Sequence, residues 1–333
     1  MNRFTSIRRL LVLAVFYATS FVAISEDKVS NNPIPWIHSL PEEFQKTVLW
    51  CADHEEGTLH DWEYDDPANS GGGIFNTGSD EEVYARVVTN ISFSGTHSVQ
   101  ASISHAYRSK KGNKAVRLMR WTDKPWDRGG KEFPQEVYYS TWMMIPENYS
   151  PNKEAPWDPG DGGWWNVFQF KSDDKNGESQ PVWGLNIVRD KPAQQMKLYL
   201  YSEYNQPHSN DIAADPLPVG KWFHIEAFYK QSGRMERTGE IAFWLDGKEV
   251  FKAKKVVTRI HGTSAIWGIG NYTDHIDGGT IPGSATVYFD DAIVSTAPVH
   301  PYVKAYFGLE KAKQTQSNHV LEDTARKLAD PQH

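Results

Sequence analysis

Apolar and polar residues alternate in short runs through most of this chain. Such runs lie at residues 46–54, 97–107, 114–121, 136–145, 165–171, 182–188, 195–204, 221–230, 239–253 and 285–294. A period of two is typical of β-strands, and the Gly, Pro, Asn and Asp clusters between the runs are typical of turns. No amphipathic helix of any length precedes residue 300. The pattern predicts an all-β fold, a β-sandwich or jelly roll.

One turn between two of these strands can be read directly. Asp246-Gly247 separates the strand-like segments FWL and KEVFK. An Asp-Gly pair between two strands favours the type I′ turn of a tight hairpin, in which both residues take positive φ angles. We therefore expect a β-hairpin over residues 239–253.

The first 25 residues have the features of a secretory signal peptide. Three arginines precede an apolar run from Leu10, and residues 23–25 form a small-x-small pattern that places cleavage near Ser25–Glu26. The alternative is an uncleaved anchor, although the apolar run is short for a stable membrane span. We expect three parts and a secreted or periplasmic protein. The parts are a signal peptide (1–25), a jelly-roll domain (26–300) and a polar C-terminal tail (301–333) that is a weak helix or a loose end.

The charge balance excludes one class of partner. The whole chain has a net charge of −7, and removal of residues 1–25 takes away three of 35 basic residues and no acidic ones, which leaves −10. A protein this acidic has no overall field that attracts nucleic acid. We expect no nucleic-acid partner, no membrane contact after signal cleavage, and a monomer. The single cysteine, Cys51, excludes an internal disulfide and disfavours a lipoprotein anchor.

The run WWNVFQFK at residues 164–171 mixes aromatic and polar residues within one strand. With a period of two, alternate residues from Trp164 to Phe170 point to one side, and those from Trp165 to Lys171 point to the other. The first set ends in two phenylalanines and fits a core. The second set ends in Gln169 and Lys171 beside a tryptophan, which suits a sugar-binding surface. The alternative is the ordinary solvated face of a sandwich strand.

Three other runs offer polar residues opposite apolar ones. In KLYLYSEY the leucines fit a core, which leaves Tyr199 and Tyr201 on the opposite face. In KWFHIEAFYK the apolar positions leave His224 on the other side. In AVRLMRW, Arg117 and Arg120 point to opposite faces, so at most one of them lines a common surface.

Several segments together resemble the concanavalin A-like jelly-roll polysaccharide lyases, the group around heparin lyase I and glucuronan lyase. They fall within about residues 45–297 and are YYSTWMMIPENY, WWNVFQFKSDD, QPVWGLNI, VGKWFHIEAFYK, GEIAFWLDGKEVF, WGIGNY and VYFDDAIV. The hairpin pattern with its tryptophan is shared with many jelly-roll sugar binders, lectins included, whereas FQF and GIGNY are more typical of the lyases. The resemblance implies a jelly-roll β-sandwich of concanavalin A-like type that acts on an acidic polysaccharide.

The resemblance also implies roles for individual residues. Tyr272, just after Gly-Ile-Gly, stands where the similar lyases have a catalytic tyrosine. Gln169 begins the glutamine-aromatic pair that a catalytic histidine follows in enzymes like heparin lyase I, and here that next position is Lys171. A lysine neutralises a carboxylate well but is a poor base unless burial lowers its pKa.

β-Elimination at a uronic acid requires three functions: neutralisation of the carboxylate, a base for the C5 proton, and an acid for the departing oxygen. The expected catalytic residues are Tyr272 as base or acid, Gln169 and Lys171 for the carboxylate, and His224 in reserve for proton transfer. Tyr199 is a second reserve. The expected substrate-binding residues are Arg117, Asn166, Trp165, Tyr199, Tyr201 and Asn271.

Two alternatives come from other functional classes. One is a non-catalytic, lectin-like carbohydrate-binding protein, which Lys171 in the histidine position makes credible. The other is a glycoside hydrolase that uses Glu203 and Glu226. The Glu-x-Asp-x-x-Glu pattern of jelly-roll glucanases, which puts the needed carboxylates on one strand face, is absent from the sequence.

A structural calcium ion is expected, because similar jelly rolls often bind one between the first and the last strand. The segments CADHEEG (51–57) and YFDDAIV (288–294) match these positions, and carboxylate oxygens suit Ca²⁺. The candidate ligands are Asp53, Glu55 and Asp291, and the alternative is a solvated acidic turn. No organic cofactor is expected.

Overall fold

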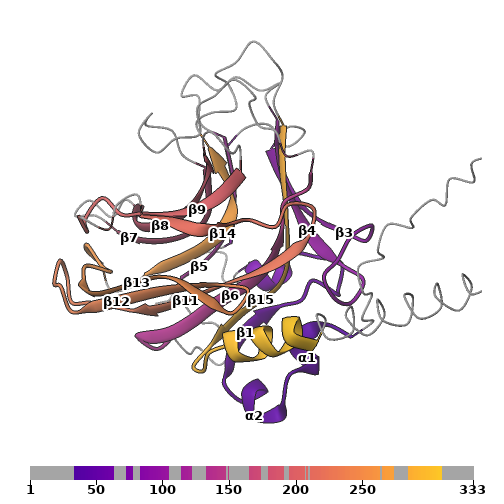
Figure 1. The fold of residues 1–333 in the computed structure, drawn as a ribbon, viewed down its shortest axis with the longest axis horizontal. Helices are drawn as coiled ribbons and strands as arrows, with labels where there is room; N and C mark the ends of the chain where they lie inside the picture. The colour runs from indigo at the N-terminus through magenta and orange to yellow at the C-terminus, as the bar shows by residue number, and fades with distance from the viewer. Residues whose placement is uncertain are drawn as a thin grey trace, which may run out of the picture.

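The computed structural model of the protein is a sandwich of two antiparallel β-sheets (Figure 1). It describes residues 34–63, 73–77, 83–104, 114–121, 133–147, 149, 165–173, 179–190, 195–206, 208, 211–262, 265–273 and 284–309. The expected signal peptide (1–25), Trp164 and residues 310–333 of the expected tail lie outside the described residues. The all-β jelly-roll class predicted from the alternation is confirmed.

The two sheets, here named sheet A and sheet B, have eight and seven strands. Sheet A contains, in spatial order, β13 (Lys248–Val256), β12 (Gly239–Leu245), β11 (Trp222–Lys230), β6 (Glu136–Met144), β15 (Ser284–Ser295), β4 (Ser98–Ser104) and β3 (Val83–Val88), and β1 (Val48–Ala52) also pairs with β15. Sheet B contains β10 (Asp211–Pro216), β9 (Gln195–Tyr201), β8 (Ser179–Asp190), β7 (Trp165–Asp173), β14 (Ile266–Thr273), β5 (Lys114–Trp121) and β2 (Gly73–Thr77).

Short helices lie at the two ends of the described chain. They are α1 (Trp36–Ser39), α2 (Glu42–Gln45), η1 (His60–Trp62) and a helix over residues 300–309. The expected hairpin is present between β12 and β13, and its turn residues Asp246 and Gly247 have φ angles of 50° and 78°. Both angles are positive, as a type I′ turn requires.

The core lies between the sheets and is rich in aromatic rings. Phe170 of sheet B stacks on Tyr229 of sheet A, with ring centroids 3.9 Å apart and an interplanar angle of 18°. Phe168 meets Phe243 edge-on at 5.8 Å. These rings are almost completely buried, and burial of one such side chain contributes roughly 2–3 kcal/mol. The inner face of β7 is therefore fixed by Phe168 and Phe170, as the alternation predicted.

A β-bulge around Val167 changes which residues of β7 share a face. The register shifts between Asn166 and Phe168 against β8, and between Ile269 and Tyr272 against β14. Beyond the bulge the alternation resumes with the opposite parity. As a result Asn166 joins Gln169 on the outer face, whereas Trp165 points into the core, where it is 2% exposed.

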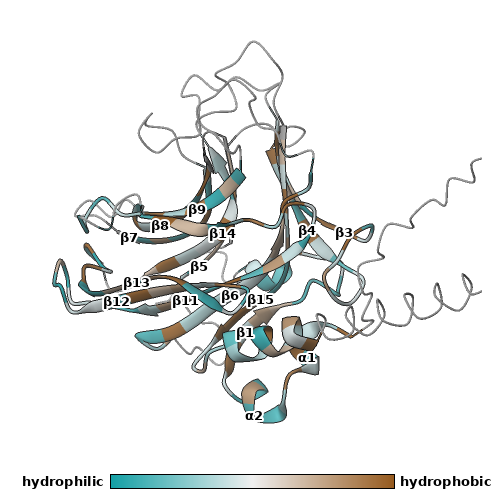
Figure 2. Cartoon of the chain, viewed as in Figure 1, coloured by the Kyte–Doolittle hydropathy of each residue, from teal (hydrophilic) through white to brown (hydrophobic). Residues whose placement is uncertain are grey.

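The outer face of sheet A is covered by segments from both ends of the described chain. Trp36 of α1 packs edge-on against Trp142 of β6, and the ring of Phe93 stacks on Trp142 at 3.5 Å. The helix over residues 300–309 adds Tyr306, 5.7 Å from Trp142. Figure 1 shows α1, α2 and this helix on the side of sheet A away from sheet B, and Figure 2 shows that they carry hydrophobic as well as hydrophilic residues. These aromatic residues form a second apolar layer, and the ring of His224 is packed within it against Trp36 and Trp142.

Candidate active site

A row of polar side chains crosses sheet B on the side away from sheet A, which we name the polar face. Tyr272 of β14 pairs with Asn166 of β7. Asn166 pairs with Asn186 of β8, which in turn pairs with Tyr199 of β9. Directly paired residues on neighbouring strands point to the same face of a sheet. Asn166, Asn186 and Tyr199 are each at most 9% exposed, so the middle of this row is well shielded from water.

Gln169 lies in the next row of the polar face between two glycines. Its neighbours across the strands are Gly268 of β14 and Gly184 of β8. A Cβ atom at Gly268 would lie 2.2 Å from Met119 Sδ, so the side chain of Met119 already occupies that space. The only acceptor for Gln169 Nε2 among the described residues is this sulfur, at 3.9 Å. Because sulfur is a weak acceptor, the amide keeps hydrogen-bonding capacity for a ligand.

Lys171 and Tyr201 are half-buried members of the same face. Lys171 is two residues beyond Gln169 on β7, and Tyr201 pairs with Gly184. Burial raises the pKa of Tyr201, and the charge of Glu203 raises it further. The structure thus places Gln169, Lys171, Tyr199 and Tyr201 on one face, as expected, but Gln169 and Tyr199 are more deeply buried than the alternation suggested.

Arg117 of β5 brings a positive charge to the polar face. Its guanidinium carbon lies 4.8 Å from the ring centroid of Tyr272. Within the described part of the chain, no carboxylate forms an ion pair with Arg117, and its buried Nε has no hydrogen-bond acceptor. Burial lowers the pKa of Arg117, but a guanidinium stays protonated in proteins. Arg120 points to the other face, over Trp50, so the predicted separation of the two arginines is confirmed.

The structure corrects the assignment of Trp165 and Asn271 as substrate-binding residues. Trp165 Nε1 donates to Asn271 Oδ1 at 3.0 Å, and Asn271 Nδ2 donates to the carbonyl oxygens of Ala101 and Ala285 in sheet A. Asn271 is completely buried. Both side chains therefore point into the core, where they connect the two sheets, and neither lies on the polar face.

The assignment of His224 as a catalytic reserve is also corrected. His224 belongs to β11 of sheet A and is 0% exposed, between the rings of Trp36 and Trp142. Burial lowers its pKa to about 3. Because the polar face belongs to the other sheet, His224 cannot reach a ligand there.

The two carboxylates of the hydrolase alternative lie far from one another in the fold. Glu226 is on β11 of sheet A, completely buried, and it accepts hydrogen bonds from the backbone N–H groups of Val299 and His300. Glu203 follows β9 of sheet B and is exposed. A retaining or inverting pair needs both carboxylates beside one bond, so this arrangement argues against that alternative.

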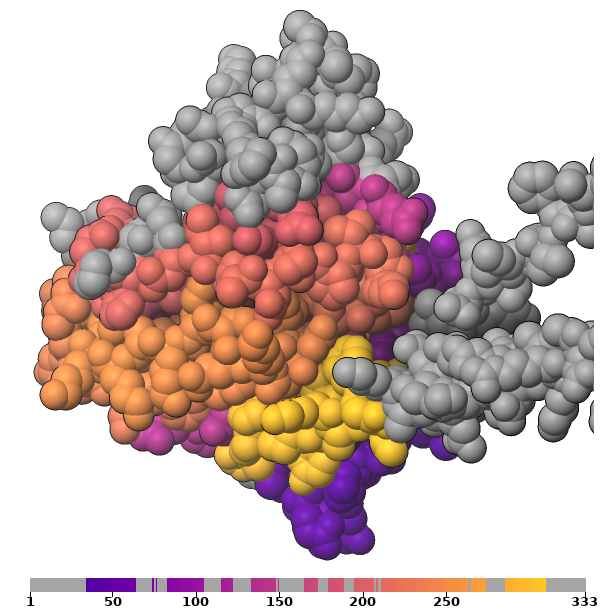
Figure 3. Space-filling view, viewed as in Figure 1, coloured from indigo at the N-terminus to yellow at the C-terminus, as the bar shows by residue number. Residues whose placement is uncertain are grey.

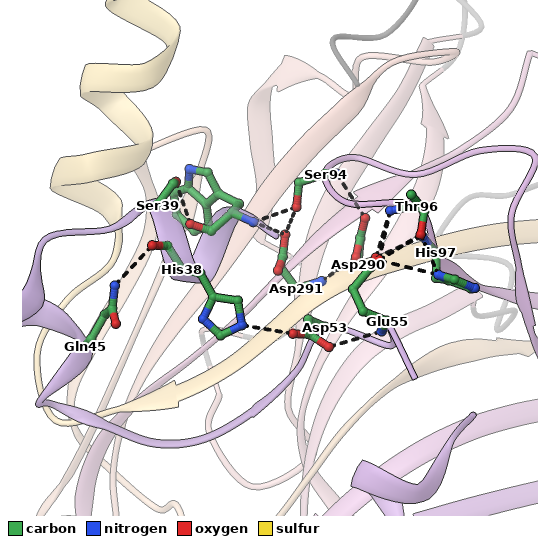
Figure 4. A network of polar contacts seen from close by, with 11 residues as sticks. His38, Ser39, Gln45, Asp53, Glu55, Ser94, Thr96, His97, Asp290 and Asp291 are labelled. Atoms are coloured by element: carbon green, nitrogen blue, oxygen red, sulfur yellow. Dashed lines mark hydrogen bonds and ion pairs between the residues drawn. The ribbon is translucent and has the colours of Figure 1, made fainter. Parts of the chain in front are cut away.

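The three candidate calcium ligands lie near one another but already accept hydrogen bonds from the protein (Figure 4). Glu55 accepts from Thr96 N at 2.9 Å, Thr96 Oγ1 at 2.8 Å and His97 N at 2.9 Å. Asp53 accepts from the backbone N–H of Glu55 and pairs with His38. These bonds use the oxygens that a cation would need.

Asp291, the third candidate, is buried beside Asp290 at the first and last strands of the described sheet. Its Oδ2 accepts from Ser94 Oγ at 2.5 Å and from Trp36 N at 3.3 Å. Burial raises the pKa of Asp291 to about 7, which favours a protonated group rather than a cation ligand. Among the described residues no group of three or more His, Cys, Asp or Glu side chains is arranged to hold a metal ion. Asp291 Oδ1, however, is buried without a hydrogen-bond partner among the described residues. The calcium site therefore stays an untested prediction.

Asn186 is the residue of the polar face that the sequence reasoning missed. The signal was present in VWGLNIV, where Gly184 and Asn186 alternate with Trp183, Leu185 and Ile187. The three apolar residues are buried in the core, and the alternation puts Gly184 and Asn186 on the opposite face. If VWGLNIV is interpreted as one continuous apolar run, it does not indicate that Asn186 lies on the polar face.

Comparisons with known proteins identify the class of this molecule. Residues 54–292 match the family described as "Polysaccharide lyase", and the chain belongs to this family. Its fold resembles the crystal structure of an endo-β-1,4-glucuronan lyase from the fungus Trichoderma reesei, with 18% sequence identity, a TM-score of 0.51, and coverage of 75% of this chain and 96% of the other. A search of curated protein sequences finds no match.

Two alginate lyases are similar at lower scores. The enzyme vAL-1 from Chlorella virus has 14% identity and a TM-score of 0.43, and 75% of this chain covers 100% of that chain. The enzyme from Aplysia kurodai has 13% identity and a TM-score of 0.43, with the same two coverages. The expected family and the expected enzyme class, a polysaccharide lyase, are confirmed by the family match. No helix in the described ranges has the length and apolar character of a membrane span.

Proposed function

We propose that this protein is a secreted lyase that cleaves a uronic acid-containing polysaccharide by β-elimination on the polar face of sheet B. The observation that carries the proposal is Arg117, a mostly buried cation with no acidic partner among the described residues. An unpaired buried charge is costly. The carboxylate of a uronic acid would supply the missing partner, and a neutral sugar would not.

The polar face offers a group for each step of the elimination. Arg117, Lys171 and Gln169 bind the carboxylate and stabilise the charge that builds on it as the C5 proton leaves. Tyr272, next to Arg117, removes the C5 proton or donates one to the departing oxygen. The electron pair of the C5–H bond forms the C4=C5 double bond, the C4–O bond breaks, and the departing oxygen takes a proton. Tyr199 stays a candidate for the second transfer, since His224 is on the other sheet.

The secreted location rests on residues 1–25, whose basic start, apolar run and small-x-small end are those of a cleaved signal. Mass spectrometry of the protein exported from its host should give the mass of a chain that begins near Glu26. A full-length mass in the membrane fraction would favour the uncleaved anchor.

The activity is tested by incubating the mature protein with glucuronan and alginate, the polymers named for proteins of similar fold, and with a neutral glucan as control. The unsaturated product absorbs ultraviolet light, so absorbance should rise with at least one uronate polymer and not with the glucan. Binding of uronate polymers without any unsaturated product would favour the lectin-like alternative. Lys171 in the histidine position would then be the natural explanation.

A further inference from the structure

Two asparagine side chains on the polar face form a small hydrogen-bonded unit. Asn166 Nδ2 donates to Asn186 Oδ1 at 2.9 Å and also lies within reach of the carbonyl oxygens of Phe168, at 3.3 Å, and Leu185, at 3.4 Å. Asn166 is 9% exposed and Asn186 is 3% exposed. Deep burial makes each unfilled donor or acceptor in this unit costly.

The contacts of Asn166 determine which way the Asn186 amide points. Two carbonyl oxygens surround Asn166 Nδ2, so this atom must be the nitrogen that donates. The atom of Asn186 that faces it must then be the acceptor, Oδ1, which turns Asn186 Nδ2 away from Asn166. Among the described residues Asn186 Nδ2 has no acceptor. Its two N–H groups are thus a shielded and unused donor on the polar face.

The space beside this donor is kept open by Gly184. A Cβ atom there would lie 3.0 Å from Asn166 Nδ2, 3.7 Å from Asn186 Oδ1 and 3.8 Å from Asn186 Nδ2, so both amides border the position that a side chain would fill. Gln169 of β7 and Tyr201 of β9 are the partners of Gly184 on its two sides. Gln169 is the neighbour of Gly184 on β7, but its Nε2 faces Met119 Sδ on the other side of that strand. Among the described residues, the amide of Asn186 is therefore the free donor beside the position above Gly184. A neutral donor without an acceptor, beside an open position on the polar face, suits an oxygen of an anion.

We propose that Asn186 donates a hydrogen bond to the carboxylate of the substrate's uronic acid, above Gly184 and beside Gln169, and that Asn166 is the positioning residue that orients the Asn186 amide. This inference rests on the proposed lyase function and adds a specificity residue to it. Arg117 and Lys171 attract the anion by charge, whereas the Asn186 amide recognises the carboxylate by direction.

The test compares two ligands and a set of variants of the mature protein. The ligands are an oligoglucuronide and the same oligomer with its carboxyl groups reduced to alcohols, and the measurement is the Kd of each by calorimetry. Asn186→Ala should raise the Kd for the oligoglucuronide about 10- to 100-fold, as expected for loss of a hydrogen bond to a charged group. The Kd for the reduced oligomer should change less than about threefold. Equal losses for both ligands would overturn the proposal.

Asn186→Asp keeps the shape and the acceptor for Asn166 but turns an oxygen toward the slot. It should bind the oligoglucuronide more weakly than Asn186→Ala does, because two carboxylates then face each other. Asn166→Ala should have no further effect when Asn186 is already alanine, since a positioning residue acts through its partner. Binding by Asn186→Asp equal to that of the unmutated protein would contradict the inference.

The matched control is Asn205→Ala, which removes another fully buried asparagine, one that donates to Ser202 and Val257 away from the polar face. It should lower the melting temperature but leave the ratio of the two Kd values unchanged. If the unmutated protein binds the oligoglucuronide but never cleaves it, the lyase proposal fails and the Kd ratios still decide the role of Asn186. If it binds neither ligand, both proposals fall.

Discussion

The outer faces of the two sheets carry polar residues in similar strand patterns, but these polar side chains are buried on sheet A and partly exposed on sheet B. On sheet A, Glu226 and His224 lie under α1 and the helix over residues 300–309 and are completely buried. On sheet B, Arg117, Lys171 and Tyr272 stay partly exposed. Figure 3 shows the helix over residues 300–309, in yellow, against the orange strands of sheet A and the indigo N-terminal segment.

The clearest difference is between Glu226 and Arg117, since both ring nitrogens of His224 are buried without a hydrogen-bond partner among the described residues. Glu226 accepts from Val299 N at 2.8 Å and also lies 3.1 Å from His300 Nδ1. These contacts hold the start of the helix over residues 300–309 against sheet A. Arg117 has no such partner among the described residues. Unused hydrogen-bonding capacity therefore indicates a ligand contact only where the side chain is also accessible, as Arg117 is and His224 is not.

Removal of the Tyr272 hydroxyl should give the largest effect on the polar face. Tyr272→Phe keeps the ring beside Arg117 and deletes the hydroxyl that we propose transfers a proton. We expect turnover of a uronate polymer to fall about 10²–10⁴-fold while binding stays nearly intact. The unsaturated product is measured by absorbance and binding by calorimetry. Retention of most of the activity would show that another group, with Tyr199 as the first candidate, transfers this proton.

Asn271→Ala probes the core side of the same strand. It removes the acceptor of Trp165 and the donor to two carbonyl oxygens of sheet A. Because these partners stay buried, we expect the free energy of unfolding to fall by about 2–4 kcal/mol. Urea unfolding followed by tryptophan fluorescence measures this loss. An unchanged stability together with weaker substrate binding would restore the assignment that the structure corrects.

Lys171→Ala should affect both binding and rate, because in the proposed function the ammonium group attracts the carboxylate before and during the reaction. We expect kcat/KM to fall about 10- to 100-fold, with part of the loss in KM. Lys171→Arg, which keeps the positive charge, is the matched control and should lose less. A loss confined to kcat would instead assign Lys171 to proton transfer.

His224→Phe should leave activity unchanged and improve stability in acid. Burial lowers the pKa of His224 to about 3, below an unfolded-state value of about 6.5. The stability linked to this group is therefore complete above pH 6.5 and is lost as the pH falls towards 3. Relative to its effect at pH 8, the substitution should raise the free energy of unfolding at pH 5 by about 2 kcal/mol. Denaturant titrations at the two pH values measure the difference, and an equal effect at both would contradict the shift.

Chelation should have the smallest effect. Because both oxygens of Glu55 and of Asp53 already take part in contacts within the protein, we expect the same melting temperature with excess calcium and with excess chelator. A bound ion would stabilise the protein by roughly 3 kcal/mol at 100 times its Kd. A clear decrease in melting temperature with chelator would therefore support the calcium prediction and require these carboxylates to rearrange.

Alternation predicted the strands and the inner face of β7, because Phe168 and Phe170 follow the period that a buried face imposes. It could not predict the bulge at Val167, which depends on how β7 pairs with both β8 and β14. This one irregularity exchanged the positions of Trp165 and Asn166. Alternation also indicated Gln169 and Lys171, Tyr272 was found through resemblance, and Asn186 required knowledge of its neighbours.

The burial of His224 has a different cause, which the alternation of apolar and polar residues along its strand cannot predict. Its strand reads correctly, with Phe223 and Ile225 in the core between the sheets. The other side of the strand is covered by Trp36 and Phe93, which lie more than a hundred residues earlier in the sequence. Contacts between such distant segments are set by the fold as a whole, so a single strand cannot reveal them.

The described chain begins at α1 and ends at the helix over residues 300–309, both packed on sheet A and behind the polar face (Figure 1). A linker that starts from either of these helices would leave from the rear of the molecule. Attachment of the enzyme to a bead, or fusion to a scaffold protein, at these positions should therefore leave a long polymer free to approach sheet B. The same placement makes either helix a suitable position for a fluorescent reporter that does not compete with the substrate.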